Sequence, residues 1–345
     1  MNKKKITTMK VAGTYIGTIV GAGFASGQEI LQFFVSFGKM GFIGLFVITL
    51  LFIFFGYIVM DLGNKLKVQN HLPIVRKTGG RILGTFSDIV ITFFLFGALT
   101  AMIAGSGAIF AQEFNLHPLI GSLFMSLISI ITVMGGFSGT INSISYVVPF
   151  LLLSAIGVSI ASIFLSPANY CFKEFPRSGI LRNWLWSSIL YVSYNSVTAI
   201  SILGPLGYNV GDKKIIRKGA ILGGLGLGIG ATAIFISLYV NSNTIHNLEV
   251  PMLFVAGRIS PFVKIFYSII LLAEIYTTAV SHLYGFSSRL CTNEKNKPLI
   301  IISSTVIAFV LSLAGFSNLV RYLYPIIGYC GVITLMGLIY HRFKS

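Results

Sequence analysis

The residues that could do chemistry gather in two short stretches that interrupt apolar sequence. The first is "GAGFASGQE", residues 21–29, which lies between the apolar stretches 11–20 and 30–37 and ends on Glu29. Each glycine costs a helix interior about 0.8–1.0 kcal/mol relative to alanine, so this cluster favours an unwound segment. Unwound backbone in apolar surroundings is tolerated only inside the protein or beside a wet cavity. The stretch therefore predicts a ligand site built from backbone groups.

Such a segment can bind a molecule that carries both a positive and a negative charge. N–H groups at the start of the second half-helix attract an anion, and free carbonyl oxygens suit an ammonium group or a small cation. The alternative is a packing face of small residues, because Gly13, Gly17 and Gly21 recur at four-residue spacing. That alternative stays open for Gly13 and Gly17, but packing alone does not explain the cluster from Gly21 to Gly27. Glu29 would repel a substrate carboxylate, so we interpret it as a gating or titrating residue.

The second stretch is "AEIYTTAVSH", residues 273–282. Helical spacing places Glu274, Thr277, Thr278 and Ser281 on one stripe. Their oxygens form a candidate site for a hard monovalent cation, or the hydroxyls donate back to carbonyls of their own helix; both interpretations stay open. An ionisable residue inside a bilayer is a functional candidate by default, so Glu274 is either a proton-titrating coupling group or a structural hydrogen-bond partner. His282 is interpreted as a satisfied polar residue near the inner helix end.

Composition indicates the elements that must position these residues. Hydrophobic residues make up 55% of the 345 residues and charged residues only 10%, with a mean hydropathy of +0.86. Soluble domains carry about 25% charged residues, so the chain is predicted to be an all-α, multi-pass membrane protein. The net charge of +16 is interpreted as membrane topology and not as nucleic-acid binding, because Lys and Arg collect in cytoplasmic loops.

Apolar windows predict ten transmembrane helices. They cover residues 10–36, 40–62, 84–111, 118–135, 143–165, 183–209, 216–240, 262–287, 298–315 and 319–340. With the N-terminus in the cytoplasm, the inner segments hold 18 of the 25 Lys and Arg residues, which supports cytoplasmic termini at both ends. Two outer connections are long, 166–182 and 241–261, and the second is a candidate helical lid.

Ten helices divide into two halves of five, about 10–165 and 183–340, of opposite orientation within one domain. Inverted halves with a helix interrupted at matching positions are typical of transporters. The first helix of the second half carries "SYNSVT", residues 193–198, at its middle. We therefore predict that helices 1 and 6 are both broken. The alternative is that these polar residues of helix 6 make hydrogen bonds between helices.

The segment "GTYIGTIVGAGFASGQEILQFF", residues 13–34, closely resembles the first helix of the YkvI-type bacterial membrane proteins. It is also similar to the broken helix of the amino acid–polyamine–organocation superfamily, and "YNSVTAI", residues 194–200, extends the likeness. The resemblance implies a leucine-transporter-type fold with broken first and sixth helices around the substrate. It implies that N–H groups near Ala22 and Gly23 bind a substrate carboxylate, and that Tyr194, Asn195 and the carbonyls near Ile19 meet the amino group.

The resemblance also implies an ion site beside Thr277 and Thr278, although the carboxylate of Glu274 departs from that pattern. The candidate substrate-binding residues are Ile19, Gly21, Ala22, Gly23, Phe24, Tyr194, Asn195 and Ser196. The candidate ion-binding or coupling residues are Val20, Glu274, Thr277, Thr278 and Ser281, and the candidate gating residue is Glu29.

The expected function is secondary active transport of a small amino acid or similar zwitterion across the bacterial cytoplasmic membrane, coupled to sodium or protons. A substrate-sensing receptor of the same fold and an ion channel are the alternatives. The chain has no HExxH, GxSxG or Walker motif, so we expect neither an enzyme nor ATP drive, and no cofactor beyond a coupling Na⁺ or H⁺. The expected partners are the solute and the lipid bilayer, with the oligomeric state left open.

Overall fold

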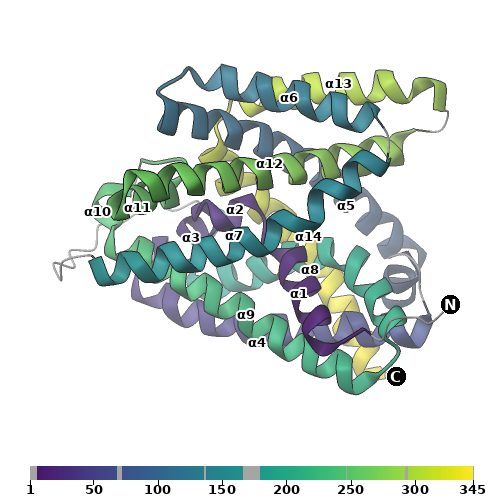
Figure 1. Ribbon diagram of the computed structural model, residues 1–345. Helices are drawn as coiled ribbons and strands as arrows, with labels where there is room; N and C mark the ends of the chain where they lie inside the picture. The colour runs from purple at the N-terminus through teal and green to yellow at the C-terminus, as the bar shows by residue number, and fades with distance from the viewer. Residues whose placement is uncertain are drawn as a thin grey trace.

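The computed structural model describes residues 6–67, 72–135, 137–165, 179–245, 247–291 and 294–344, and every regular element in them is a helix (Figure 1). The first half contains α1 Thr8–Ile19, α2 Ala22–Ala25, α3 Gln28–Phe33, the short 3-10 turn η1 Val35–Phe37, α4 Lys39–Leu66, α5 Leu72–Phe114, α6 Pro118–Met134 and α7 Phe137–Leu165. The second half contains α8 Trp184–Val210, α9 Lys213–Val240, α10 Ser242–Ile245, α11 Pro251–Ile259, α12 Pro261–Leu290, η2 Glu294–Asn296, α13 Lys297–Ser312 and α14 Phe316–Lys344.

Among the described residues, six helices are long and apolar enough to cross a membrane. They are Lys39–Leu66, Gly84–Phe114, Trp184–Val210, Lys213–Val240, Pro261–Leu290 and Phe316–His341, and three shorter apolar helices accompany them, Pro118–Met134, Leu153–Leu165 and Lys297–Ser312. Each predicted window coincides with one helix or, at 10–36, with a chain of short ones. The helical membrane class is therefore confirmed, while the number of crossings and their orientation stay predictions.

The first predicted helix is interrupted twice within the glycine cluster. The chain is extended at Gly21, with φ −129° and ψ −173°, so α1 ends before it and α2 begins after it. A second interruption follows at Gly27, whose φ of 82° lies in the left-handed region that glycine adopts without steric cost. The prediction of a broken first helix is confirmed. The second interruption, between α2 and α3, was not predicted from the sequence.

The predicted break in the sixth helix is wrong, because α8 runs without interruption from Trp184 to Val210. Its central polar side chains are satisfied on the helix itself. Asn195 Nδ2 donates to Tyr191 O at 3.0 Å, and Thr198 Oγ1 donates to Asn195 O at 2.9 Å. Ser193 Oγ instead reaches Gly328 O of α14 at 2.8 Å. Ser193 thus makes the hydrogen bond between helices that was the alternative interpretation. The middle of α8 contains no glycine that would favour unwinding.

Close helix approach depends on glycines other than those predicted. A Cβ on Gly13 would meet no atom within 4 Å, so Gly13 provides no packing face. Glycines of α9 and α4 allow the close approach of α1, since a Cβ on Gly223 would be 2.5 Å from Tyr15 Cδ1 and one on Gly56 would be 2.5 Å from Tyr15 Cε1. At the crossing of α4 and α8, a Cβ on Gly63 would overlap the carbonyl of Gly204, and one on Gly207 would overlap the carbonyl of Met60. These two helices therefore touch through their backbones.

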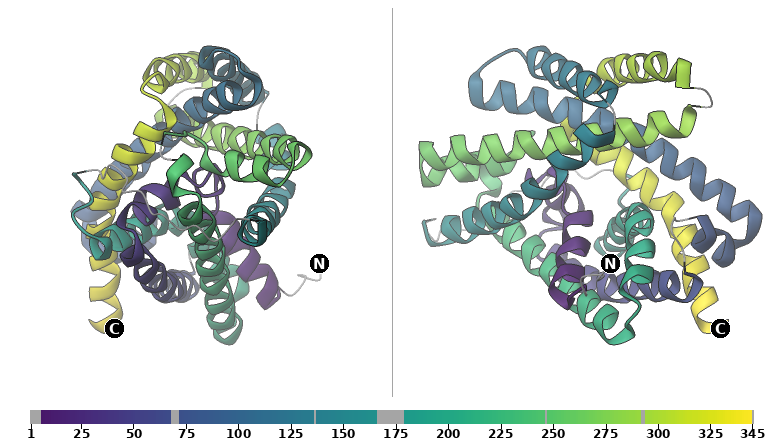
Figure 2. Two further views of the ribbon diagram at one scale, coloured as in Figure 1. Left: turned by 90° about the vertical axis from the view of Figure 1, so that its left-hand side faces the viewer. Right: turned by 45° about the vertical axis from the view of Figure 1, so that its right-hand side comes forward.

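The helices form two groups with the interrupted helix between them. α1, α4, α8 and α9 pack on one another, and α5, α6, α12 and α13 pack on one another, with α14 contacting both α8 and α5. In Figure 1, α6 and α13 lie at one side of the molecule, α4 and α9 lie at the opposite side, and α2 lies between. The two further views keep the same separation (Figure 2). The free backbone of the breaks is thus placed at the junction of the two groups.

The segment after α9 is helical, as predicted for the second long connection, and it covers the second interruption of the first helix. Met252 N–H of α11 donates to Ser26 O at 3.0 Å, and Tyr267 Oη of α12 donates to Ala25 O at 2.5 Å. Gln112 of α5 makes two hydrogen bonds to the backbone of Val250, at 2.8 and 3.2 Å. Its function as a lid stays a prediction, and the other long connection lies outside the described residues at 166–178.

Glu249, in the loop before α11, supplies a prediction about pH. Its Oε2 accepts the N–H of Phe316 at 3.3 Å, and burial raises the pKa of the carboxyl above its ordinary value, an effect that this hydrogen bond partly offsets. A pKa raised by folding gives stability that is complete below the unfolded pKa of about 4.3 and is lost as pH rises through the folded value. We therefore expect Glu249→Gln to raise the Tm at pH 8 and to leave it unchanged near pH 4. Asp212→Asn removes a carboxylate elsewhere as a control, and an equal Tm difference at both pH values would contradict the assignment.

Candidate functional site

A cavity of about 340 Å³ lies at the first interruption, between α1 and α2. It is lined by Gly17, Thr18, Ile19, Val20, Gly21, Ala22, Gly23, Glu29, Ile91, Phe94, Leu95, Ala98, Met102, Tyr194, Asn195, Thr198, Ser201, Ile202, Glu274, Thr277, Thr278, Ser281, His282 and Tyr324. These residues come from α1, α2, α3, α5, α8, α12 and α14, so both helix groups contribute to the wall. A cavity of this size suits a small solute, since ligand pockets begin at about 300 Å³.

One wall consists of the first interruption and a carboxylate that folds back onto it. Glu29 lies in the first turn of α3, and the turn at Gly27 brings its side chain beside Gly23, where an added Cβ would overlap Glu29 Oε1. Only 6% of Glu29 is exposed, and its Oε2 accepts a hydrogen bond of 2.5 Å from Tyr194 Oη. The carboxylate is therefore part of the cavity wall, held between the break and α8, and its predicted gating role stays a prediction.

Aromatic rings surround that carboxylate. The ring of Tyr194 lies 5.2 Å from the ring of Tyr324, 5.8 Å from that of Phe33 and 6.4 Å from that of Phe94, measured between centroids. Tyr191 meets Tyr194 edge-on at 5.5 Å. Aromatic faces carry partial negative charge and attract cations within about 6 Å. This part of the cavity is therefore both apolar and suited to a positive group.

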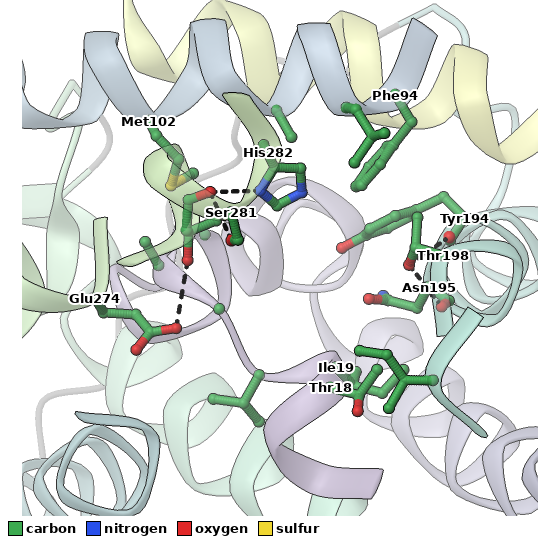
Figure 3. Close-up of a pocket in the computed structure, with 18 of the residues that line it drawn as sticks. Thr18, Ile19, Phe94, Met102, Tyr194, Asn195, Thr198, Glu274, Ser281 and His282 are labelled. Carbon is green, nitrogen blue, oxygen red and sulfur yellow. Dashed lines mark hydrogen bonds between the residues drawn. The ribbon is translucent and has the colours of Figure 1, made fainter. Parts of the chain in front are cut away.

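The opposite wall is the stripe predicted on α12, and Figure 3 shows Glu274, Ser281 and His282 facing the side chains of α8 across the cavity. Thr277 Oγ1 donates to Glu274 O at 3.0 Å, and Ser281 Oγ donates to Thr277 O at 2.8 Å. These two hydroxyls thus bond back to their own helix, which was the alternative to an ion site. A hydroxyl that donates one hydrogen bond keeps its acceptor lone pairs, and both residues line the cavity, so the back-bonding leaves the coordination of a cation open.

Glu274 is the least satisfied polar group of this wall. Only 3% of the residue is exposed, Thr278 Oγ1 donates to its Oε1 across a long 3.4 Å, and its Oε2 is buried without a hydrogen-bond partner. His282 is satisfied as predicted, with Nδ1 2.6 Å from Thr278 O, and it also lines the cavity. Burial of a carboxylate oxygen without a hydrogen-bond partner costs free energy. A ligand or a proton bound to Glu274 would remove that cost.

The structure brings together twelve of the predicted site residues and places two elsewhere. The twelve are Ile19, Val20, Gly21, Ala22, Gly23, Glu29, Tyr194, Asn195, Glu274, Thr277, Thr278 and Ser281. Phe24 and Ser196 are buried but do not line the cavity. The Phe24 ring turns to α9, with Cζ 3.5 Å from the position of a Cβ on Gly230. Their predicted roles in substrate binding lack support from the geometry, because neither residue lines the cavity.

Sequence reasoning missed the lining residues of α5 and α14. Phe94, Met102 and Tyr324 lie in long apolar windows, where nothing distinguishes a ring that faces a cavity from one that faces lipid. Thr198 of α8 stood within the polar stretch "SYNSVT", so its spacing of one turn from Tyr194 was an available signal.

The fold and this cavity define a class, the multi-pass helical membrane proteins of the leucine-transporter type. Three solved structures are similar to this chain in fold. The inward-facing conformation of Mhp1 has a TM-score of 0.59 and 14% identity over 93% of this chain and 73% of its own. A substrate-bound Na⁺-coupled sialic acid symporter has a TM-score of 0.56 and 15% identity over 96% and 77%. A manganese transporter of Eremococcus coleocola has a TM-score of 0.61 and 11% identity over 96% and 78%.

These neighbours are transporters and not enzymes, and identities this low show the fold alone. No protein-family model matches the chain. Two Bacillus subtilis (strain 168) proteins match almost end to end. The membrane protein YkvI is 30% identical over 341 residues, covering 98% of this chain and 97% of its own length. YyaD is 28% identical over 332 residues, covering 96% and 95%. The chain belongs to the YkvI family of membrane proteins.

Proposed function

We propose that the chain is a secondary active transporter that carries a small solute with an amino group, coupled to a cation and working by alternating access. An amino acid or similar zwitterion is the substrate expected from the sequence. The observation that carries the proposal is the cavity itself. It lies at a helix break between two helix groups, and it holds one carboxylate from α3 of the interrupted helix, Glu29, and one from α12 of the second group, Glu274. A site shared by two groups can be exposed to either side when one group moves against the other.

The packing of the helices supports one domain of ten spans in two inverted halves. If α1 to α3 count as the first span, the five spans of the first half are followed by α8, α9, α12, α13 and α14 in the second. The contact between α1 and α9 then corresponds to the contact between α8 and α4. The contact between α5 and α14 corresponds to the contact between α12 and α7. The pairs α5 with α6 and α12 with α13 also correspond. Exchange of the halves thus preserves these contacts, although the extensive contact of α8 with α14 has only a small counterpart in α2 with α7.

The lining residues support an inward-open form if both termini are cytoplasmic. Beyond the break, the cavity continues along Gly17 and Thr18 toward the start of α1, and along Ser201 and Ile202 toward the end of α8. The opposite side of the break is covered by α11, through Met252. In the proposed orientation the solute would leave this form toward the cytoplasm of a bacterial cell.

Coupling to a cation is supported by the oxygens of α12. Thr277, Thr278 and Ser281 place hydroxyls on the cavity wall beside Glu274, and hard cations prefer oxygen ligands. Carbonyl groups freed near Val20 would complete a sodium site. A proton carried by Glu274 is the other form of coupling, and the two forms differ in their dependence on sodium.

The proposal is tested by thermal stabilisation of the purified protein with a panel of amino acids and amines, in sodium and in potassium chloride. We expect at least one amino compound to raise the Tm, more in sodium, and Thr278→Val to remove the sodium effect. Thr305→Val is the matched control, since Thr305 Oγ1 bonds to Ile301 O at 2.8 Å on α13, outside the cavity.

Sodium-independent binding would indicate proton coupling, and no stabilisation by any amino compound would contradict the proposed function. Uptake of the stabilising compound into proteoliposomes separates a transporter from a receptor, which would bind without accumulation. Unitary currents in a bilayer recording would instead indicate a channel.

A further inference from the structure

The charges of the cavity are unbalanced. Two carboxylates line it, from Glu29 and Glu274, and among its lining residues there is no Lys or Arg. His282 is the basic residue among the lining residues, and its Nδ1 lies 2.6 Å from Thr278 O. A zwitterion adds as much negative as positive charge to such a site, whereas a cation offsets the charge already there. Buried carboxylates require a counter-charge or a proton.

The position expected for a substrate carboxylate is beside a carboxylate of the chain. The resemblance places that anion at the N–H groups of Ala22 and Gly23, yet Glu29 Oε1 lies so near Gly23 that a Cβ there would overlap it. α2, which would supply the attractive dipole, has only four residues, Ala22–Ala25. A helix dipole is the sum of aligned peptide units, so one turn supplies little attraction for a substrate anion that would lie beside the carboxyl group of Glu29.

An independent feature points to a cation on the other wall. Glu274 lines the cavity (Figure 3), its Oε2 is buried without a hydrogen-bond partner, and the Thr278 hydroxyl reaches only Oε1. An ammonium group has three donors and no acceptor, so it satisfies an orphan carboxylate oxygen without creating a new unpaired acceptor. The rings of Phe94, Tyr194 and Tyr324 add faces that attract a cation.

From these observations we infer that the cavity selects an organic amine without a free carboxylate, a solute with net positive charge, over the corresponding zwitterion. The inference rests on the proposed function and narrows its substrate class. The ammonium group meets the carboxylates of Glu29 or Glu274, and the apolar remainder of the solute lies against the rings and Met102. Tyr194, which donates to Glu29 at 2.5 Å, fixes one of the two carboxylates in place.

The test compares matched pairs on the purified wild-type protein. The pairs are alanine with ethylamine, leucine with isoamylamine, and phenylalanine with phenethylamine, together with the amide of each amino acid. Binding is measured by titration calorimetry at pH 7. We expect the preferred amine, and the matching amide, to bind at least tenfold more tightly than its amino acid, because only the amino acid adds a carboxylate.

Two isosteric variants examine the cause. Glu29→Gln keeps an acceptor for Tyr194, and Glu274→Gln keeps one for Thr278, but each removes one charge. We expect each variant to reduce the amine-to-zwitterion preference at least fivefold. Asp212→Asn, at the start of α9 and outside the cavity, is expected to leave the preference unchanged.

The outcomes separate the two claims. If an amino acid binds as tightly as its amine or more tightly in the wild-type protein, the inference is overturned and the proposed function stands. If amines are preferred but neither Gln variant changes the ratio, the carboxylates are not the cause and the inference is again overturned. If no amine, amide or amino acid binds, the proposed function fails with it. The wild-type comparison is decisive even where a variant does not fold.

Discussion

Gly207→Ala is expected to destabilise the protein more than any other single methyl group added at a described position of α8. Its Cβ would overlap the carbonyl oxygen of Met60, which belongs to the backbone of α4 and cannot turn aside. Gly63, one turn along α4 from Met60, presents the same overlap with Gly204. Overpacking in well-packed cores costs on the order of 3 kcal/mol when no side chain can move. Separation of α4 from α8 would also displace Tyr194 from the cavity.

The measurement is thermal unfolding in detergent, followed by size-exclusion chromatography. We expect a fall in Tm of about 5 °C or more, with a similar fall for Gly63→Ala. Gly157→Ala in α7 is the matched control, because a Cβ on Gly157 would meet no atom within 4 Å. An unchanged Tm for Gly207→Ala would mean that α4 and α8 do not touch through their backbones.

Gly23→Ala is expected to weaken solute binding at least about tenfold while leaving the fold intact. The added Cβ would overlap Glu29 Oε1, the end of a side chain, so the carboxylate can move at little cost to the backbone. It then loses its hydrogen bond from Tyr194 Oη, and a hydrogen bond to a charged group contributes about 1.5–3 kcal/mol. The loss of a fixed carboxylate from the cavity corresponds to an affinity at least about tenfold weaker.

The affinity for the preferred amino compound is measured by calorimetry on protein whose Tm is within a few degrees of wild type. Gly13→Ala is the control, since Gly13 lies in the same interrupted helix and faces open space. Retention of full affinity by Gly23→Ala would show that the position of Glu29 against the break is unimportant for binding.

The interruption of the first helix was predictable because glycine acts through the backbone, independently of its neighbours. The interruption predicted in α8 failed for a complementary reason. Polar side chains such as Asn195 and Thr198 can satisfy themselves on the preceding turn, and their presence alone leaves a helix intact. Interruption thus follows from the loss of helix propensity, and polarity by itself is a weaker signal.

The position of Glu29 was not predictable, because it depends on a second turn at Gly27 whose direction is set by packing on α11 and α14. Spacing did predict the stripe on α12, since an uninterrupted helix has a fixed period. The rings of Phe94 and Tyr324 had no such signal, because a window apolar on every side does not reveal which face meets the cavity. The sequence thus predicted residues on regular elements better than those placed by turns.

The short helix α2 lies between the cavity and the segment α11, and it contacts both. Its first residues line the cavity, and the carbonyls of Ala25 and Ser26 at its end accept hydrogen bonds from Tyr267 and Met252. Four residues are too few to bend, so a solute that shifts Gly23 also shifts Ser26. The single hydrogen bond from Met252 of α11 contributes about 1 kcal/mol, a free energy that solute binding could offset. In the proposed transporter we therefore expect solute occupancy and the release of α11 to be linked through one turn of chain.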